Sequence, residues 1–283
     1  MKRFVPLFAA LLATFAALLG ASCSTHEDFD HMVLLPSHKS EQNLEALAAR
    51  YPSAGYAEVM ERAKAYSLKG ATVAYFGASL ANNKECDVAK EMLANALQCK
   101  VVTYGYGGYA FGDGNRTLKT YADQLRAHDV YILFATTNDY FRDVPLGLPT
   151  DYTAADGFDG GKTASACGGL NYILQQIRRR NPKALVVAFN CPKFFNAVRS
   201  DGMDRSSQAT NGLGLGFHDY LDAYEACFRN AGVPCLDQWA FEGFTPKNWM
   251  EFYMEDGVHL NENGYFLLGI LQLNFLLDHL TPQ

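Results

Sequence analysis

Clustered basic residues are scarce in this sequence. Lys and Arg together number 24, against 30 Asp and Glu, and the formal net charge is −6 at pH 7. Proteins that bind nucleic acid draw much of their affinity from basic side chains that neutralise phosphates, and those side chains gather in patches or runs. The acidic balance and the absence of basic runs therefore argue against nucleic acid as a partner.

Long apolar runs are absent after the N-terminal region, whereas a membrane-spanning helix needs about 20 apolar residues. At the N-terminus, Lys2 and Arg3 precede a stretch without charge, and small residues then lead into Cys23. This pattern resembles a bacterial lipoprotein signal, which is removed before a cysteine that receives lipid. We expect residues 1–22 to be the signal and Cys23 to anchor an exported protein to a bacterial cell membrane, facing the periplasm or the surface. A plain signal peptide and an uncleaved anchor are the alternatives.

A metal-binding cysteine pattern is also missing. Six cysteines follow Cys23, and an exported protein can form disulfides from them. Cys227 and Cys235 are close enough in sequence to bridge a helix end and a strand. The favoured interpretation is that most of the six are small buried apolar residues. We expect neither a metal nor an organic cofactor.

The chain is long enough, and apolar enough, for one large domain. It has 283 residues, of which 49% are hydrophobic and 19% charged, so a sizeable core is available and disorder of the whole chain is excluded. Residues 23–40 are polar and lack periodicity, which predicts a tether between lipid and domain. The domain itself is expected at residues 41–283.

From about residue 70 onward, short apolar runs alternate with segments of helical periodicity. Strands are expected at residues 71–76, 100–104, 130–135, 184–189 and 233–236. Helices are expected at residues 40–50, 57–66, 85–97, 117–127, 165–180, 218–231 and 265–279. Strands that are apolar along their whole length and alternate with helices predict a parallel sheet covered on both faces. The predicted fold class is α/β, with three α/β/α layers around a mostly parallel five-stranded sheet.

Polar or glycine residues follow three of these strands, at the sheet edge where such folds place their ligands. Ser79 comes just after the first strand, Gly108 lies in a glycine cluster after the second, and Asn138 follows the third. Each has an ordinary structural explanation, as a helix cap, a glycine turn and an Asn-Asp turn. Each could also serve chemistry, as a nucleophile, a backbone donor and a side-chain donor.

A carboxylate and a histidine lie three residues apart before the last helix. Asp256 could accept a hydrogen bond from Nδ1 of His259 and leave Nε2 free to take a proton. A histidine near a helix start with an unrelated acid is the alternative. With the three earlier positions, this pair completes what acyl transfer needs: a nucleophile, a base, an orienting acid and oxyanion donors.

These four blocks together resemble the SGNH/GDSL hydrolase family over residues 71–279. The resemblance implies a flavodoxin-like SGNH hydrolase fold and a serine esterase without cofactor. It assigns Ser79 as nucleophile, with His259 and Asp256 completing the catalytic triad. It also assigns the oxyanion hole to the N–H of Ser79, the N–H of Gly108 and the side-chain amide of Asn138.

Three positions depart from the usual pattern of that family. Ala78 stands where an Asp is usual, Thr103 where an Asn is common, and Thr136 where a Gly is usual. An ordinary α/β-hydrolase fits less well, because its Gly-x-Ser-x-Gly elbow would need a glycine in place of Ala81.

The substrate expected from location and resemblance is an ester, with O-acetyl or other O-acyl groups on carbohydrate ranked above lipid esters. A lipase, an acyltransferase of the same family, and a surface glycan-binding lipoprotein without catalysis remain alternatives.

Overall fold

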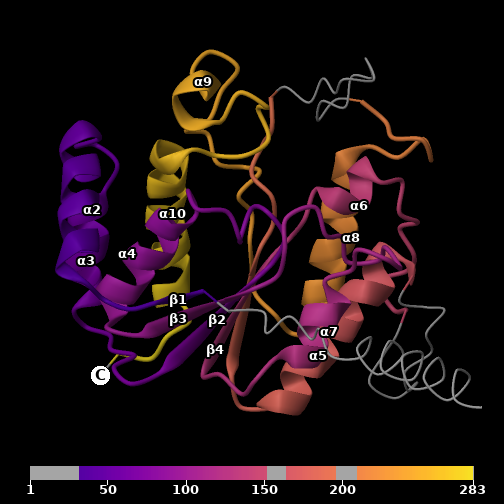
Figure 1. Cartoon of the computed structure of the whole chain (residues 1–283), viewed down its shortest axis with the longest axis horizontal. Helices are drawn as coiled ribbons and strands as arrows, with labels where there is room; N and C mark the ends of the chain where they lie inside the picture. The colour runs from indigo at the N-terminus through magenta and orange to yellow at the C-terminus, as the bar shows by residue number, and fades with distance from the viewer. Residues whose placement is uncertain (1–31, 152–163, 196–208, 283) are drawn as a thin grey trace, which may run out of the picture. The chain divides into compact units, whose positions relative to one another are not determined.

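The computed structural model describes residues 32–151, 164–195 and 209–282, which belong to one compact unit spanning Met32–Gln283 (Figure 1). The predicted signal, the predicted lipid attachment at Cys23 and the first part of the predicted tether lie outside the described residues. Within those residues, no helix is both long enough and apolar enough to cross a membrane.

A single mixed sheet forms the middle layer of this unit. Its six strands are β1 (Val33–Leu34), β2 (Thr72–Phe76), β3 (Lys100–Tyr104), β4 (Val130–Phe134), β5 (Leu185–Phe189) and β6 (Cys235–Leu236). They lie in the order β1-β3-β2-β4-β5-β6, and all neighbours are parallel except β1, which runs antiparallel to β3. The central strands are buried almost throughout, because helices cover both faces of the sheet.

The sheet has six strands where the sequence predicts five, and the extra one lies inside the predicted tether. Val33 and Leu34 pair with Val102 and Val101 at the edge of the sheet. Two residues are too short to show an alternating pattern, so this strand forms only because β3 offers its free edge. The helix that follows begins at His38, and Ser37 caps it by accepting from Ser40 N–H. The folded domain therefore starts before residue 41.

Two groups of helices make up the outer layers (Figure 1). On one face lie α2 (His38–Arg50), α3 (Tyr56–Ala63), α4 (Asp87–Leu97) and α10 (Glu262–Leu277). On the other lie α5 (Lys119–Gln124), α6 (Asn138–Phe141), α7 (Ala166–Arg180) and α8 (Phe217–Asn230). The short α9 (Trp249–Phe252) packs against α10. The three-layer α/β/α class predicted from the sequence is confirmed.

The last helix determines where the Asp256 segment lies. α10 is apolar on nearly every side, which fits a helix enclosed by α2, α3, α4 and α9. Asn261 caps it by accepting from Gly264 N–H at 3.1 Å. Tyr265, in its first turns, is fully buried and donates to the carbonyl of Leu80 at 2.9 Å. The start of α10 is therefore fixed beside the loop that follows β2.

Candidate active site

Ser79 lies in a tight turn directly after β2. Gly77 N–H donates to the carbonyl of Tyr104 at 3.0 Å, which continues the β2–β3 pairing into the turn. A Cβ at Gly77 would lie 2.7 Å from Ala81 Cβ and 3.0 Å from Phe134 Cβ, so this position has no room for a side chain. The turn presents Ser79 half-buried at the carboxyl edge of the sheet.

The structure brings Ser79, His259 and Asp256 into one chain of hydrogen bonds. Nε2 of His259 lies 2.8 Å from Oγ of Ser79, and Nδ1 lies 2.5 Å from Oδ2 of Asp256. Ser79 and His259 are 180 positions apart in sequence, so only the fold can create this contact. The arrangement places a base against a hydroxyl and an acid against the far side of the same ring.

The environment of Asp256 keeps its carboxylate charged. Partial burial by itself raises the pKa of Asp256, but hydrogen bonds from the His259 ring and from the N–H groups of His259 and Val258 outweigh burial and lower it to about 2. Both N–H bonds go to Oδ1 at 2.9 Å, which leaves Oδ2 for the ring. A charged acceptor at Nδ1 favours the tautomer in which Nε2 carries no proton.

The glycine loop, residues 105–112 after β3, approaches the Ser79 turn closely. Gly105 has φ +129°, and a Cβ there would lie 1.7 Å from the carbonyl oxygen of Gly77. A Cβ at Gly107 would be in ordinary contact with Ser79 Cβ, at 3.6 Å. Gly108 has φ +78° and open space beside it. Within the described part of the chain, the N–H groups of Ser79 and Gly108 donate to no acceptor.

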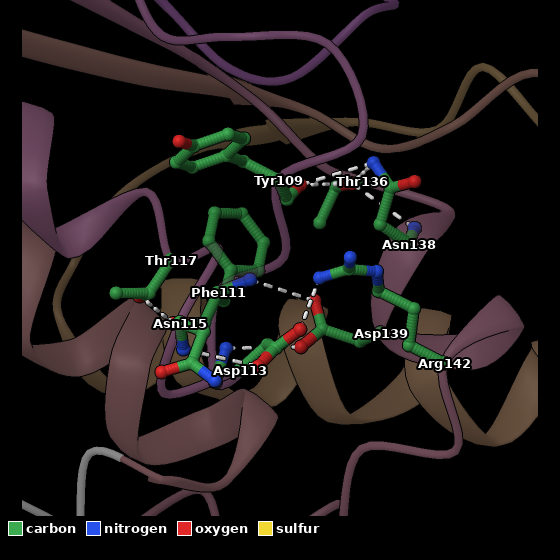
Figure 2. Close-up of polar contacts among 10 residues, drawn as sticks. Tyr109, Phe111, Asp113, Asn115, Thr117, Thr136, Asn138, Asp139 and Arg142 are labelled. Atoms are coloured by element: carbon green, nitrogen blue, oxygen red, sulfur yellow. Dashed lines mark hydrogen bonds and ion pairs between the residues drawn. The ribbon is translucent and has the colours of Figure 1, made fainter.

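Asn138 reaches the same edge from the start of α6 (Figure 2). Its Nδ2 donates to Thr136 Oγ1 at 2.8 Å and to the carbonyl of Tyr109 at 3.0 Å. Thr136 Oγ1 also donates to the Tyr109 carbonyl at 3.2 Å. The amide therefore lies at the carboxyl edge of the sheet, and both of its hydrogens are directed at acceptors within the protein.

Asp139 is a polar residue of the site region whose role the sequence did not reveal. It is fully buried and accepts from the N–H groups of Phe111 (Figure 2) and Gly112, each at 3.0 Å. It also accepts from the hydroxyl of Tyr224 at 2.8 Å. Burial outweighs these hydrogen bonds and raises the pKa of Asp139. This carboxyl joins the end of the glycine loop to α6 and α8. The adjacent Asn-Asp pair was a signal of a turn only.

Metal and disulfide chemistry find little support among the described residues. There, no group of three or more His, Cys, Asp or Glu side chains is arranged to hold a metal ion. All six cysteines after Cys23 are free thiols, and all but Cys235 are buried. The interpretation of these residues as small buried apolar side chains is confirmed for those five.

Comparison with known proteins identifies the family. Residues 69–267 match the model of the GDSL-like Lipase/Acylhydrolase family. A search of curated proteins found no matching relative.

Solved structures share the fold. A protein from Lactobacillus plantarum superposes with a TM-score of 0.61 at 23% identity, covering 76% of this chain and 99% of its own. A possible lipase from Chitinophaga pinensis superposes with a TM-score of 0.55 at 18% identity, covering 74% of this chain and 98% of its own. An inhibitor-bound aryl esterase of M. smegmatis superposes with a TM-score of 0.51 at 16% identity, covering 74% of this chain and 100% of its own. With the family match over most of the domain, the chain belongs to the GDSL-like lipase/acylhydrolase family.

Proposed function

We propose that the protein is a serine esterase that hydrolyses carboxylic esters through an acyl-enzyme, with Ser79, His259 and Asp256 as its catalytic triad. The observation that carries this proposal is the continuous hydrogen-bonded chain from Asp256 Oδ2 through the imidazole to Ser79 Oγ, at 2.5 and 2.8 Å. The distance from His259 Nε2 to Ser79 Oγ falls within the hydrogen-bond reach that a general base and its nucleophile require. Family membership supports the same reaction class.

The chemistry follows from this geometry in two half-reactions. His259 Nε2 takes the proton of Ser79 while Oγ attacks the acyl carbon, and the same nitrogen then gives that proton to the departing alcohol. Water repeats the sequence on the acyl-enzyme: it loses a proton to Nε2, attacks the acyl carbon, and the proton returns to Ser79 as the acid leaves. Asp256 remains ionised and stabilises the imidazolium that forms in each half.

Three donors would stabilise the negative oxygen of each tetrahedral intermediate. The N–H groups of Ser79 and Gly108 donate to no acceptor within the described residues and lie at the same sheet edge. The amide of Asn138 supplies the third when one of its hydrogens turns from Thr136 to the negative oxygen. Removing one such donor typically lowers turnover by about 10²–10³.

For the substrate, the proposal is an O-acetyl or other O-acyl group on carbohydrate. Tyr106 is 57% exposed and precedes Gly107, which lies beside Ser79. Its ring packs edge-on against Tyr109, with centroids 5.4 Å apart, so an apolar face is held at the rim of the site. Such a face suits the apolar side of a sugar ring. Export and lipid attachment at Cys23, which we also propose, would place the enzyme where surface glycans occur.

The test of the esterase proposal uses a fluorophosphonate probe near pH 8 together with p-nitrophenyl acetate. Wild type should be labelled and should release p-nitrophenol, Ser79→Ala should do neither, and Ser53→Ala, an exposed serine outside the site, should behave as wild type. A folded wild type that takes no label would contradict the proposal. Acetate release from a panel of acetylated sugars then tests the carrier, and an added sugar acceptor distinguishes hydrolysis from acyl transfer.

A non-catalytic glycan-binding protein on the same scaffold is the second candidate. The observation that favours it is the Asn138 amide, whose two hydrogens are already directed at Thr136 and Tyr109. Binding of acetylated sugars with equal affinity by wild type and Ser79→Ala, without acetate release by either, is the result that would select this function.

A further inference from the structure

Lys90 is a fully buried lysine on α4 that takes no part in the mechanism above. Its Nζ lies 2.9 Å from Asp87 Oδ1, 3.2 Å from the carbonyl of Ala81 and 3.3 Å from Thr103 Oγ1. Two of the three N–H bonds of the ammonium thus have hydrogen-bond acceptors, and the Asp87 carboxylate lies at ion-pair distance. Burying a charged group is unfavourable unless ion pairing and hydrogen bonds compensate it. Packing alone therefore does not explain a lysine at this buried position.

One of the three partners lies in the turn that carries Ser79, and another lies on the strand that leads into the glycine loop. Ala81 is two residues after Ser79, in the turn that follows the nucleophile. Thr103 lies on β3, just before the glycine loop that contains Gly108. A single ammonium thereby links the Ser79 turn to the strand that leads into Gly108.

Tyr265 holds the preceding peptide of the same turn. Its hydroxyl donates to the carbonyl of Leu80 at 2.9 Å, while Lys90 donates to the carbonyl of Ala81. Two successive carbonyls after Ser79 thus accept from buried side chains. Because a peptide group is planar, fixing these carbonyls also fixes the direction of the backbone after Ser79.

The pair with Asp87 does not explain this arrangement by itself. An ion pair between residues three apart forms readily on the surface of a helix, with both groups in water. Asp87 is partly exposed, at 21%, whereas Lys90 is at 0%. Oδ1 of Asp87 also makes no directed hydrogen bond within the described residues, although it lies near Nζ. The directed bonds of Lys90 go to the Ser79 turn and to β3.

We propose that Lys90 is a positioning residue for the oxyanion hole, one that holds the N–H groups of Ser79 and Gly108 at the spacing the tetrahedral intermediate needs. Thr103 is its partner on β3, at the position where the sequence departs from the Asn common in the family. This inference rests on the proposed esterase function. It deepens that function by assigning a role to a residue that does not contact substrate.

The test compares Lys90→Met with the double variant Asp87→Asn/Lys90→Met. Methionine keeps the length of the side chain but removes its donors, and the double variant also removes the carboxylate that would be left unpaired. Displacing catalytic groups by about 1 Å can lower turnover about 10²-fold. We expect kcat on p-nitrophenyl acetate to fall by about 10-fold or more in both variants, with KM within about twofold of wild type.

Affinity for a trifluoromethyl ketone, which forms a tetrahedral adduct with serine, should fall in step with kcat/KM, because both depend on the oxyanion donors. The matched control is Asn95→Ala, on the same helix. Asn95 is also buried and donates to Ser40 Oγ at 2.6 Å, away from the Ser79 turn. This variant should lose stability but keep the kcat of its folded fraction.

A kcat of the folded double variant within about threefold of wild type would overturn the positioning role. A loss of activity that is fully explained by a smaller fraction of folded protein would overturn it too. These outcomes differ from failure of the proposed function. In that case wild type itself neither reacts with the fluorophosphonate nor hydrolyses the ester.

Discussion

At the scale of single residues, the hydrogen bonds around Asp256 couple the charge of the site to the folded state. Burial by itself raises the pKa of Asp256, and the bonds from His259 and Val258 outweigh it, lowering the pKa from 3.8 to about 2. A carboxyl group whose pKa is lower in the folded state than in the unfolded state stabilises the fold at pH values above its pKa in the unfolded state. That contribution disappears as the pH falls toward the folded value. Through the neutral range Asp256 stays ionised.

We expect Asp256→Asn to remove a part of the stability that depends on pH. The Tm of wild type should exceed that of the variant by a constant amount above about pH 5, and the excess should shrink between about pH 4 and about pH 2. Because the Asp256 side chain is 48% exposed, solvent weakens the interaction and the difference should be small. Thermal unfolding followed by circular dichroism across this range measures it. A difference that grows on acidification would contradict the lowered pKa.

The order of residues in the sequence predicted which of them lie at the strand ends, but it did not predict the hydrogen bonds that hold them there. Ser79, Gly108 and Asn138 each follow a strand, so their shared edge could be expected from parallel topology alone. Lys90 lies in a segment that reads as an amphipathic helix, and nothing in its neighbourhood distinguishes a buried lysine from a solvated one. The bond of Asn138 to Thr136 likewise depends on rotamers that no pattern encodes.

At the scale of elements, length and burial decided what could be predicted. Strands β2 to β5 are five residues each and mostly apolar, and the longer helices keep a regular spacing of apolar residues, so both were predicted within a few residues of their bounds. The missed elements, β1, α6 and α9, have two to four residues. Such short elements form because neighbours in the fold satisfy their backbone groups, and the sequence within them carries no period.

Close approach of the Ser79 turn and the glycine loop gives a prediction for Gly105. Alanine there would place Cβ 1.7 Å from the Gly77 carbonyl in addition to the strain of a positive φ, so Gly105→Ala should unfold at lower urea and lose activity. Gly70 is the matched control: its φ is +83°, and a Cβ there meets nothing within 4 Å. Gly70→Ala should therefore lose only about 1 kcal/mol, from backbone strain. Equal unfolding midpoints for the two variants would show that the loops can separate at no cost.

At the scale of the whole molecule, the domain and its attachment are separate questions. The described unit begins at Met32, and within the described residues it contains no helix able to cross a membrane. All elements that bring Ser79 and His259 together lie within residues 72–277. Attachment to a membrane, if it rests on Cys23, is therefore a property that can be removed without touching any residue of the proposed active site.

Replacement of Cys23 tests the proposed anchor. We expect Cys23→Ala to move the protein from the membrane fraction to the soluble fraction of the producing bacterium, while kcat and KM on p-nitrophenyl acetate stay as in wild type. Attachment through Cys23 requires covalent lipid, because an unmodified cysteine has too little apolar surface to hold a protein at a bilayer. Mass spectrometry of the mature N-terminus should show lipid on Cys23 of wild type. Cys235→Ala is the control, since it removes the partly exposed thiol of the domain and should leave the protein at the membrane. Retention of Cys23→Ala at the membrane through an alkaline wash would assign the attachment to an uncleaved N-terminal segment.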